Sequence, residues 1–235
     1  MNEAQLLLLT AASIAFVHTI LGPDHYLPFT AMGTARGWSL QKTLGMTLCC
    51  GTGHVLSSVV IGGVGIYFGT QLTSLVAIEG LRGNLAGWAL LAFGLMYFAW
   101  GLKKSGRGHS HAHLHSHGDL THEHEHDHQH EHMHVHEERT SGSVTPWAMF
   151  IIFVLGPCEA LIPLFMYPAA QQSAMLVLSV ALVFGVVTLV TMLIAVALTS
   201  FGIDKLKLPS IGRYSHAVAG ASIAACGAAI SFIGL

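Results

Sequence analysis

Six long apolar runs, separated by polar links, cover most of the 235-residue chain. Roughly 20 apolar residues cross the hydrocarbon core of a bilayer as a helix, so each run is long enough to span a membrane. Residues 103–145 are polar and cannot form a span. The pattern therefore predicts an all-α, polytopic membrane protein with six transmembrane helices. The six runs are residues 4–35, 43–68, 81–102, 146–170, 174–201 and 215–235.

The first and fourth runs are interrupted by proline. Pro23 and Pro28 stand in the first run, and Pro157, Pro163 and Pro168 stand in the fourth. Proline removes a helical hydrogen bond, and non-helical backbone at membrane depth is tolerated only where protein or a wet cavity covers it. We therefore predict that helices one and four are broken, and that the breaks mark a site.

The two halves of the chain resemble one another. Residues 21–25 (Leu-Gly-Pro-Asp-His) match 155–159 (Leu-Gly-Pro-Cys-Glu), and glycines of the third run match glycines of the sixth. Three spans per half is an odd number, so the second half must be inverted, a recurring plan of transporters. We predict a first three-helix repeat (1–102), a disordered His-rich loop (103–145) and a second three-helix repeat (146–235). The matched glycines are Gly87, Gly94 and Gly101 with Gly220, Gly227 and Gly234.

Composition and charge agree with a membrane protein. The chain is 52% hydrophobic and only 9% charged, whereas soluble domains are about 25% charged. The net charge of -2 says nothing about nucleic acid. The partners that we expect are a metal ion and the lipid bilayer, with no nucleic acid. Except for Arg82 at the edge of the third run, every Lys and Arg lies in the links after runs one, three and five. Basic links face the cytoplasm, so we expect a multi-pass protein of the inner membrane with both termini outside and the loop inside.

Ionisable side chains gather at the two interruptions. Each costs about 2.5–3.5 kcal/mol in the bilayer on insertion scales, so such residues are functional candidates by default. Imidazole and carboxylate ligands suit divalent first-row metals, and a thiolate would soften the site. The predicted metal ligands are His18, Asp24, His25 and His54 from the first half, and Cys158 and Glu159 from the second. Secondary candidates are Ser57, Thr188 and Thr191. Two other interpretations stay open: hydrogen-bonded packing residues, and a proton relay without metal.

The polar loop holds thirteen of the seventeen histidines, mostly at every second position and interleaved with Asp and Glu. Such a tract cannot form a core and is typical of metal-binding low-complexity segments. We predict a metal collector or sensor of low specificity rather than the selective site. Its histidines are His109, His111, His113, His115, His117, His122, His124, His126, His128, His130, His132, His134 and His136.

Two short motifs resemble a known group of proteins. His18, five residues and then Asp24-His25 resembles the signature helix of the nickel/cobalt transporter superfamily, whose permease branch has four residues at that point. Residues 53–60 (Gly-His-Val-Leu-Ser-Ser-Val-Val) are similar to the next helix of those families. The His-rich loop resembles the NicO-type exporters, and the layout resembles the LysE-type superfamily, which includes sulfite exporter-like proteins. The resemblance implies that His18, Asp24, His25 and His54 contact the metal.

These observations predict a secondary transporter of a divalent transition-metal ion, nickel or cobalt first, with zinc and iron as further candidates. We expect no enzyme and no organic cofactor. Export is favoured because the loop lies where an exporter would load, and proton coupling is plausible because metal ligands must be deprotonated. The alternatives are a sulfite-type anion exporter and a membrane metal sensor or store without flux. A thiol–disulfide carrier is disfavoured because Asp24 stands where the partner of Cys158 would be.

Overall fold

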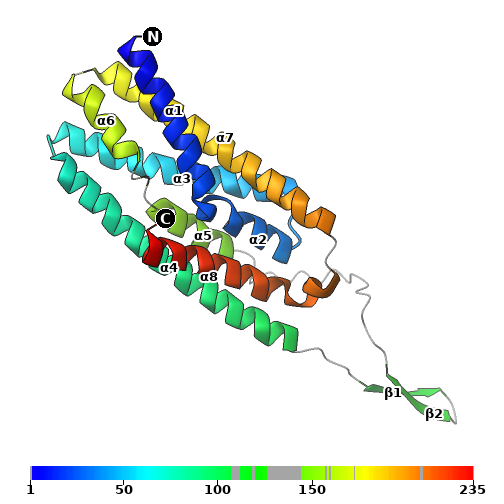
Figure 1. Ribbon diagram of the computed structural model, residues 1–235. Coiled ribbons are helices and arrows are strands. Elements are labelled where there is room, and N and C mark those ends of the chain that lie inside the picture. The colour runs from blue at the N-terminus through cyan, green and yellow to red at the C-terminus, as the bar shows by residue number, and fades with distance from the viewer. Residues whose placement is uncertain are drawn as a thin grey trace.

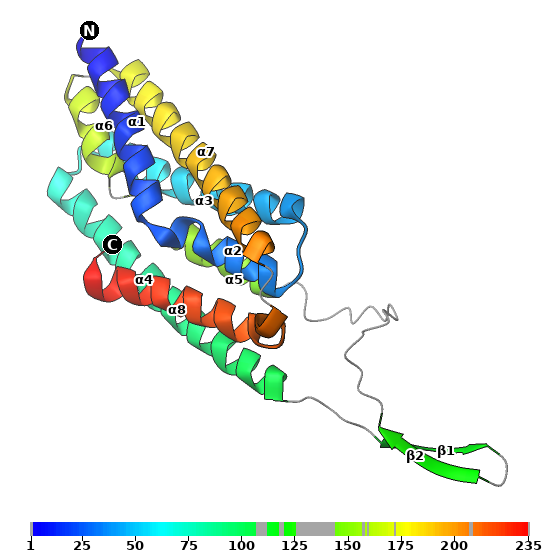
Figure 2. The ribbon, with the colours of Figure 1, turned by 45° about the vertical axis from the view of Figure 1, so that its right-hand side comes forward.

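The computed structural model describes residues 2–106, 112–117, 120–125, 144–156, 158, 160–171, 173–206 and 209–234. Within them the chain forms an elongated bundle of helices and one two-stranded hairpin (Figures 1 and 2). The elements are α1 (Glu3–Leu21), η1 (Pro23–His25, a 3-10 turn), α2 (Leu27–Ala35), α3 (Leu40–Tyr67), α4 (Leu72–Gly106), β1 (Ala112–His117), β2 (Leu120–Glu125), α5 (Val144–Leu155), α6 (Leu161–Ala170), α7 (Ala174–Leu206), η2 (Pro209–Tyr214, also 3-10) and α8 (Ser215–Ile233).

Five segments of the described chain are long and apolar enough to cross a membrane. They are α1, α3, α4, residues 174–203 of α7, and residues 212–233, which include α8. Large apolar side chains such as Leu95, Leu182 and Leu198 are more than half exposed on the outside of the bundle, where lipid would cover them. The protein is therefore a helical, membrane-embedded protein, as its hydrophobic pattern predicts. The fourth predicted run is divided between α5 (12 residues) and α6 (10 residues), each too short to span alone.

The first interruption follows directly from its sequence. The α1 helix ends at Gly22, whose N–H still donates to the carbonyl of His18 at 3.0 Å. Pro23 has no N–H to continue the ladder, and the chain makes one 3-10 turn before α2 begins. Pro28 then falls in the first turn of α2, where proline is well tolerated. His25 is thus carried on a short turn between two helices rather than on a helix face.

Two predicted boundaries are wrong. Residues 71–80 were expected to be a connection, but α4 begins at Leu72 and continues for 35 residues, so Glu79 and Arg82 lie inside a helix. The α7 helix likewise runs to Leu206, past the expected end at residue 201.

Within the expected disordered loop, β1 and β2 pair antiparallel, with His113 opposite His124 and His115 opposite His122. The rest of that expectation, including most of the loop histidines, lies outside the described residues.

The closest helix packing joins α4 to α8 through the matched glycines. A Cβ at Gly94 would overlap the backbone nitrogen of Ala224, and a Cβ at its counterpart Gly227 would overlap that of Leu91. Only glycine permits such an approach, which is the usual role of small residues between membrane helices. Residues later in α4 contact residues earlier in α8, so the two helices are antiparallel. Gly94 meets Ala224, and Gly227 meets Leu91, so each helix presents equivalent positions to the other.

The apolar core has two parts on either side of the interruptions. One joins α2, α5, α7 and α8 around Phe29, Phe153 and Ile223, and the other joins α1, α6 and α7 around Ala15 and Phe184. Figures 1 and 2 show α1 and α6 toward one end of the bundle, and α2 and α5 toward the other. The broken backbone therefore lies between two packed regions, which hold it in place.

Candidate metal centre

Three histidines from three different elements meet at the first interruption. His18 comes from the last turn of α1, His25 from η1 and His54 from the middle of α3. The ring centroids of His18 and His25 are 4.8 Å apart, and those of His25 and His54 are 5.3 Å apart. One nitrogen from each ring can be chosen so that all three atoms lie within 4.8 Å of one another. The predicted first-half histidines therefore do form one cluster.

The Nε2 atoms of His18, His25 and His54 are all buried, and none has a hydrogen-bond partner. Leaving one buried polar atom unpaired costs about 1–3 kcal/mol, so three together at one place is an unfavourable arrangement for a packing role alone. Neighbouring aromatic contacts do not relieve it, because they leave the nitrogen lone pairs unused. A ligand that accepts three lone pairs at once, such as a metal ion, would relieve all three.

The other ring nitrogens fix which atoms can bind a metal. His25 Nδ1 lies 3.0 Å from the carbonyl oxygen of Gly22, and His54 Nδ1 lies 3.3 Å from that of Phe153. A carbonyl only accepts, so each Nδ1 must carry the proton and donate it. The neutral ring then presents its lone pair at Nε2, toward the cluster. Orientation of a metal-binding imidazole by a backbone carbonyl is the usual outer-shell arrangement.

Asp24 supplies negative charge beside the cluster. Its Oδ1 is 3.3 Å from His25 Nδ1, and its side chain is 23% exposed. It lies outside the group of mutually close ligand atoms that the three histidines form. A carboxylate in this position orients His25 and offsets part of the charge of a bound cation.

Two cavities meet at Asp24 and His25. The larger, of about 600 Å³, is also lined by His18 and reaches Asn84 on α4 and Gly234 at the end of α8. The smaller, of about 30 Å³, lies against His54 and Phe153 and has the volume of about one water molecule. A solute entering the large cavity would thus meet His18, Asp24 and His25 before reaching the small cavity at His54.

Cys158, the described second-half candidate for a metal ligand, does not join this cluster. Cys158 is fully buried in the apolar core region around Ala15 and Phe184, and the metal-competent group among the described residues does not include it. Glu159 lies outside the described residues. Thr188 is buried with its hydroxyl unpaired, and Thr191 is 6% exposed. Within the described chain, the structure therefore brings together the three first-half histidines and leaves Cys158 apart from them.

Sequence reasoning missed a buried ion pair beside the site. Glu79 is fully buried and contacts Arg82, whose side chain is 12% exposed. Arg82 also donates to the hydroxyl oxygen of Ser57 at 2.7 Å, and that hydroxyl in turn donates to the carbonyl of His54. Arg82, expected at the edge of the third run, thus lies well inside the α4 helix. The available signal was the spacing of three, which places Glu79 and Arg82 side by side on a helix.

Comparisons with protein-family models, with curated proteins and with solved structures find no match to this chain.

Proposed function

We propose that this protein is a secondary transporter that moves a divalent transition-metal ion across the membrane through the His18–His25–His54 site. The observation that carries the proposal is the convergence of three buried, unpaired Nε2 atoms inside an apolar helical bundle. Three neutral imidazoles with an open position suit first-row divalent ions, and nickel and cobalt are the first candidates, with zinc and iron next.

The way the helices pack supports a 3+3 inverted repeat with six spans, in which α1 with α2 and α5 with α6 are the two broken spans. In this repeat α3 corresponds to α7, and α4 corresponds to α8. The α1 helix contacts α7, and in the other half α5 contacts α3 in the same way. The α2 helix contacts α8, and in the other half α6 contacts α4. The α4–α8 interface is its own counterpart, because equivalent glycines meet equivalent positions. Such a repeat would let two similar conformations expose the site to opposite sides in turn.

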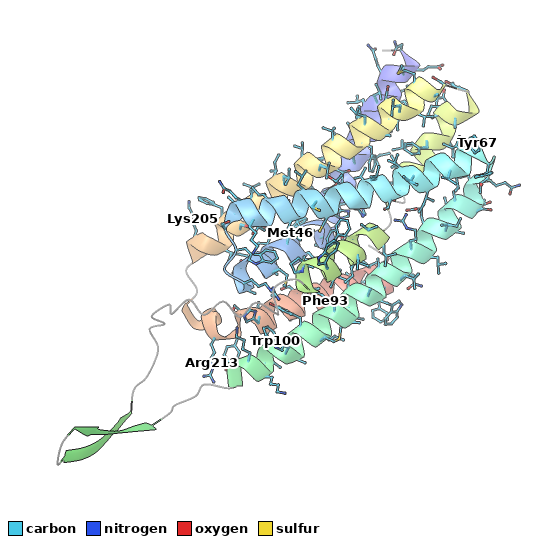
Figure 3. All side chains as sticks on the ribbon, turned by 180° about the vertical axis from the view of Figure 1, so that it is seen from behind. Met46, Tyr67, Phe93, Trp100, Lys205 and Arg213 are labelled. Atoms are coloured by element: carbon cyan, nitrogen blue, oxygen red, sulfur yellow. The ribbon has the colours of Figure 1, made fainter. Side chains whose placement is uncertain are left out.

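The distribution of basic residues supports the proposed orientation. Lys205 and Arg213 lie at one end of the bundle and Tyr67 at the opposite end (Figure 3). The end of the bundle that carries Lys205 and Arg213 would be cytoplasmic, as would the His-rich loop. Both termini would then lie outside. The loop histidines would then collect ions on the cytoplasmic side, which favours export, and the membrane would be the inner membrane.

Asp24 gives the site a means of coupling to protons. Imidazole must be neutral to bind a metal, so ion binding and protonation compete at His18, His25 and His54. Asp24 is the carboxylate in contact with this cluster and also lines the large cavity. If protons replace the metal ion when it leaves, the net charge buried at the site stays similar with the ion bound and with the ion absent.

The charged groups of the described residues favour a cation over the anion of the exporter alternative. Arg82, the arginine buried within α4, is neutralised by Glu79 and offers no free positive charge to an anion. The unpaired atoms at the interruption are imidazole nitrogens whose lone pairs repel an anion when the rings are neutral.

Uptake of radioactive nickel or cobalt by inside-out membrane vesicles tests the proposal. The wild-type protein should accumulate metal, and His25→Ala should abolish accumulation because one of the three nitrogens is lost. Gly63→Ala, which adds a methyl group with nothing within 4 Å, is the matched control and should behave as wild type. Equal flux in wild type and His25→Ala would contradict the proposal. Binding without flux would indicate a sensor or store, and flux of sulfite instead would indicate the anion exporter.

A further inference from the structure

The Glu79–Arg82 ion pair joins four separate parts of the chain. Glu79 accepts from the hydroxyl of Ser58 at 3.0 Å and from the backbone N–H of Cys158 at 3.1 Å. Arg82 donates to the backbone carbonyls of Val154 at 2.9 Å and Gly156 at 3.3 Å. The pair therefore connects α3 and α4 with both sides of the α5–α6 interruption.

Each charge of the pair binds backbone groups at the interruption. The last carbonyls of α5 have no partners within their own helix and form the negative end of its dipole, where Arg82 donates to them. On the other side, Glu79 accepts from the N–H of Cys158, which lies in the turn two residues before Ala160, the N-cap of α6. Side chains of the protein itself thus satisfy the backbone groups of Val154, Gly156 and Cys158 at the interruption.

The segment that Arg82 holds at the end of α5 also contacts the ring of His54. His54 Nδ1 donates to the carbonyl of Phe153, the residue before Val154. On the other side, a Cβ at Gly156 would lie 3.1 Å from His54 Nδ1, so the backbone of Gly156 packs directly on the ring. Arg82 holds Val154 and Gly156, which belong to the same short stretch, residues 153–156, that contacts the His54 ring.

The two interruptions are therefore used differently. At the first, the chain turns His25 and Asp24 toward a cavity, and the Nε2 atom of His25 is unpaired. At the second, the resident ion pair occupies the helix ends, and the described residue in the turn, Cys158, is held by its backbone rather than by its thiol. One break supplies ligands, and the other supplies a rigid support for the third ligand.

We propose that Glu79 and Arg82 are positioning residues for the metal site: by clamping the α5–α6 interruption, they hold His54 Nε2 in reach of an ion bound by His18 and His25. The proposal rests on the proposed function, because it needs a metal at these histidines. It predicts that disrupting the pair removes His54 from the coordination sphere although neither residue touches the metal.

The test uses the full-length chain in detergent, with the thirteen loop histidines replaced by serine so that only the buried site reports. Co²⁺ alone is the probe, and its visible absorption spectrum reports the number and type of ligands. The variants are Arg82→Lys, which keeps the charge but loses the forked donor, and Glu79→Gln, which keeps the shape but loses the charge. Arg213→Lys is the matched control, because Arg213 also donates to a backbone carbonyl, that of Ser105, elsewhere in the bundle.

We expect Arg82→Lys and Glu79→Gln to weaken Co²⁺ binding by about 10–100-fold, the usual effect of losing outer-shell support. Their spectra should match that of His54→Ala, which a merely structural role would not produce, and Arg213→Lys should match the parent. Ser58→Ala leaves both charges but removes the hydroxyl that donates to Glu79 and accepts from Arg82 and from the N–H of Cys158. It should shift binding in the same direction by less. It keeps the test decisive if the larger changes prevent folding.

Two failures are distinguishable in this experiment. If the parent chain binds no Co²⁺ through imidazole, the proposed metal site itself is wrong. If the parent binds Co²⁺ with an imidazole spectrum, but folded Arg82→Lys, Glu79→Gln or Ser58→Ala keeps the parent affinity and spectrum, the positioning role is overturned and the site stands.

Discussion

Gly22→Ala should disable the metal site by displacing one imidazole. A Cβ at this position would lie 2.5 Å from His25 Nδ1 and 2.9 Å from Asp24 Oδ1. The substitution does not strain the backbone, because Gly22 has φ -88° and ψ 91°, which any residue adopts. The strain therefore falls on the His25 ring and on the carboxylate beside it.

The size of the displacement follows from these distances. Ordinary contact with a Cβ begins near 3.4 Å, so the His25 ring must move by about 0.9 Å from its 2.5 Å approach. The three nitrogens lie within 4.8 Å of one another and must draw closer to share one ion, because metal–nitrogen bonds are only about 2.0–2.1 Å long. A His25 ring that the new methyl group displaces cannot take that position. The displacement also breaks the hydrogen bond from His25 Nδ1 to the Gly22 carbonyl. We expect at least the loss of about 10–100-fold in affinity that follows from removing ligand support, or ~1.4–2.7 kcal/mol.

Titration of Ni²⁺ or Co²⁺ into the purified chain with serine in place of the loop histidines measures this effect. Gly156→Ala gives an intermediate case, since its Cβ would meet His54 Nδ1 at 3.1 Å and a smaller movement relieves the contact. Gly63→Ala and Gly45→Ala, each with open space around the added methyl group, are the controls and should bind as the parent does. Parent-like affinity in folded Gly22→Ala would refute the argument that the His25 ring position governs binding.

Three further predictions follow from the same geometry. Asp24→Asn keeps the shape of the side chain but removes its charge, so nickel flux in vesicles should fall strongly while the protein remains folded; undiminished flux would exclude a role for the carboxylate. Gly94→Ala drives a methyl group into the backbone of Ala224, so thermal unfolding in detergent should occur at lower temperature, with a loss of about 1–3 kcal/mol, and Gly106→Ala, with open space, should not change it. Replacing the loop histidines should alter the rate of metal flux without abolishing it, and complete loss would mean that the loop, rather than the buried cluster, holds the essential site.

The sequence was sufficient for the fold class and for half of the site. Proline at position 23 and the long uncharged flanks predict an interrupted membrane helix, and α1, η1 and α2 have that form. His18 and His25 are seven residues apart, which is two turns of a helix. Their rings do lie in edge contact, although His25 belongs to a 3-10 turn and the helix that carries His18 ends before it. His54 joins them because it stands at the centre of the next run, where an ionisable group needs a buried partner.

The rest of the site was missed. Glu79 falls before the third predicted run and Arg82 at its edge, but their contact within α4 neutralises both charges and allows the helix to continue through them. Cys158 was a reasonable ligand from its place in the matched motif. Its turn instead directs the backbone toward Glu79 and leaves the thiol in the apolar core. Sequence identity at a break does not reveal which way the broken chain turns.

The central claim is that one ion is held by the three imidazoles of His18, His25 and His54. X-ray absorption of Ni²⁺ bound to the full-length chain with serine in place of the loop histidines tests it most directly. The account predicts one ion per chain with three imidazole nitrogens, falling to two in His54→Ala. Absence of stoichiometric nickel, or a coordination shell that His54→Ala and His25→Ala leave unchanged, would contradict it.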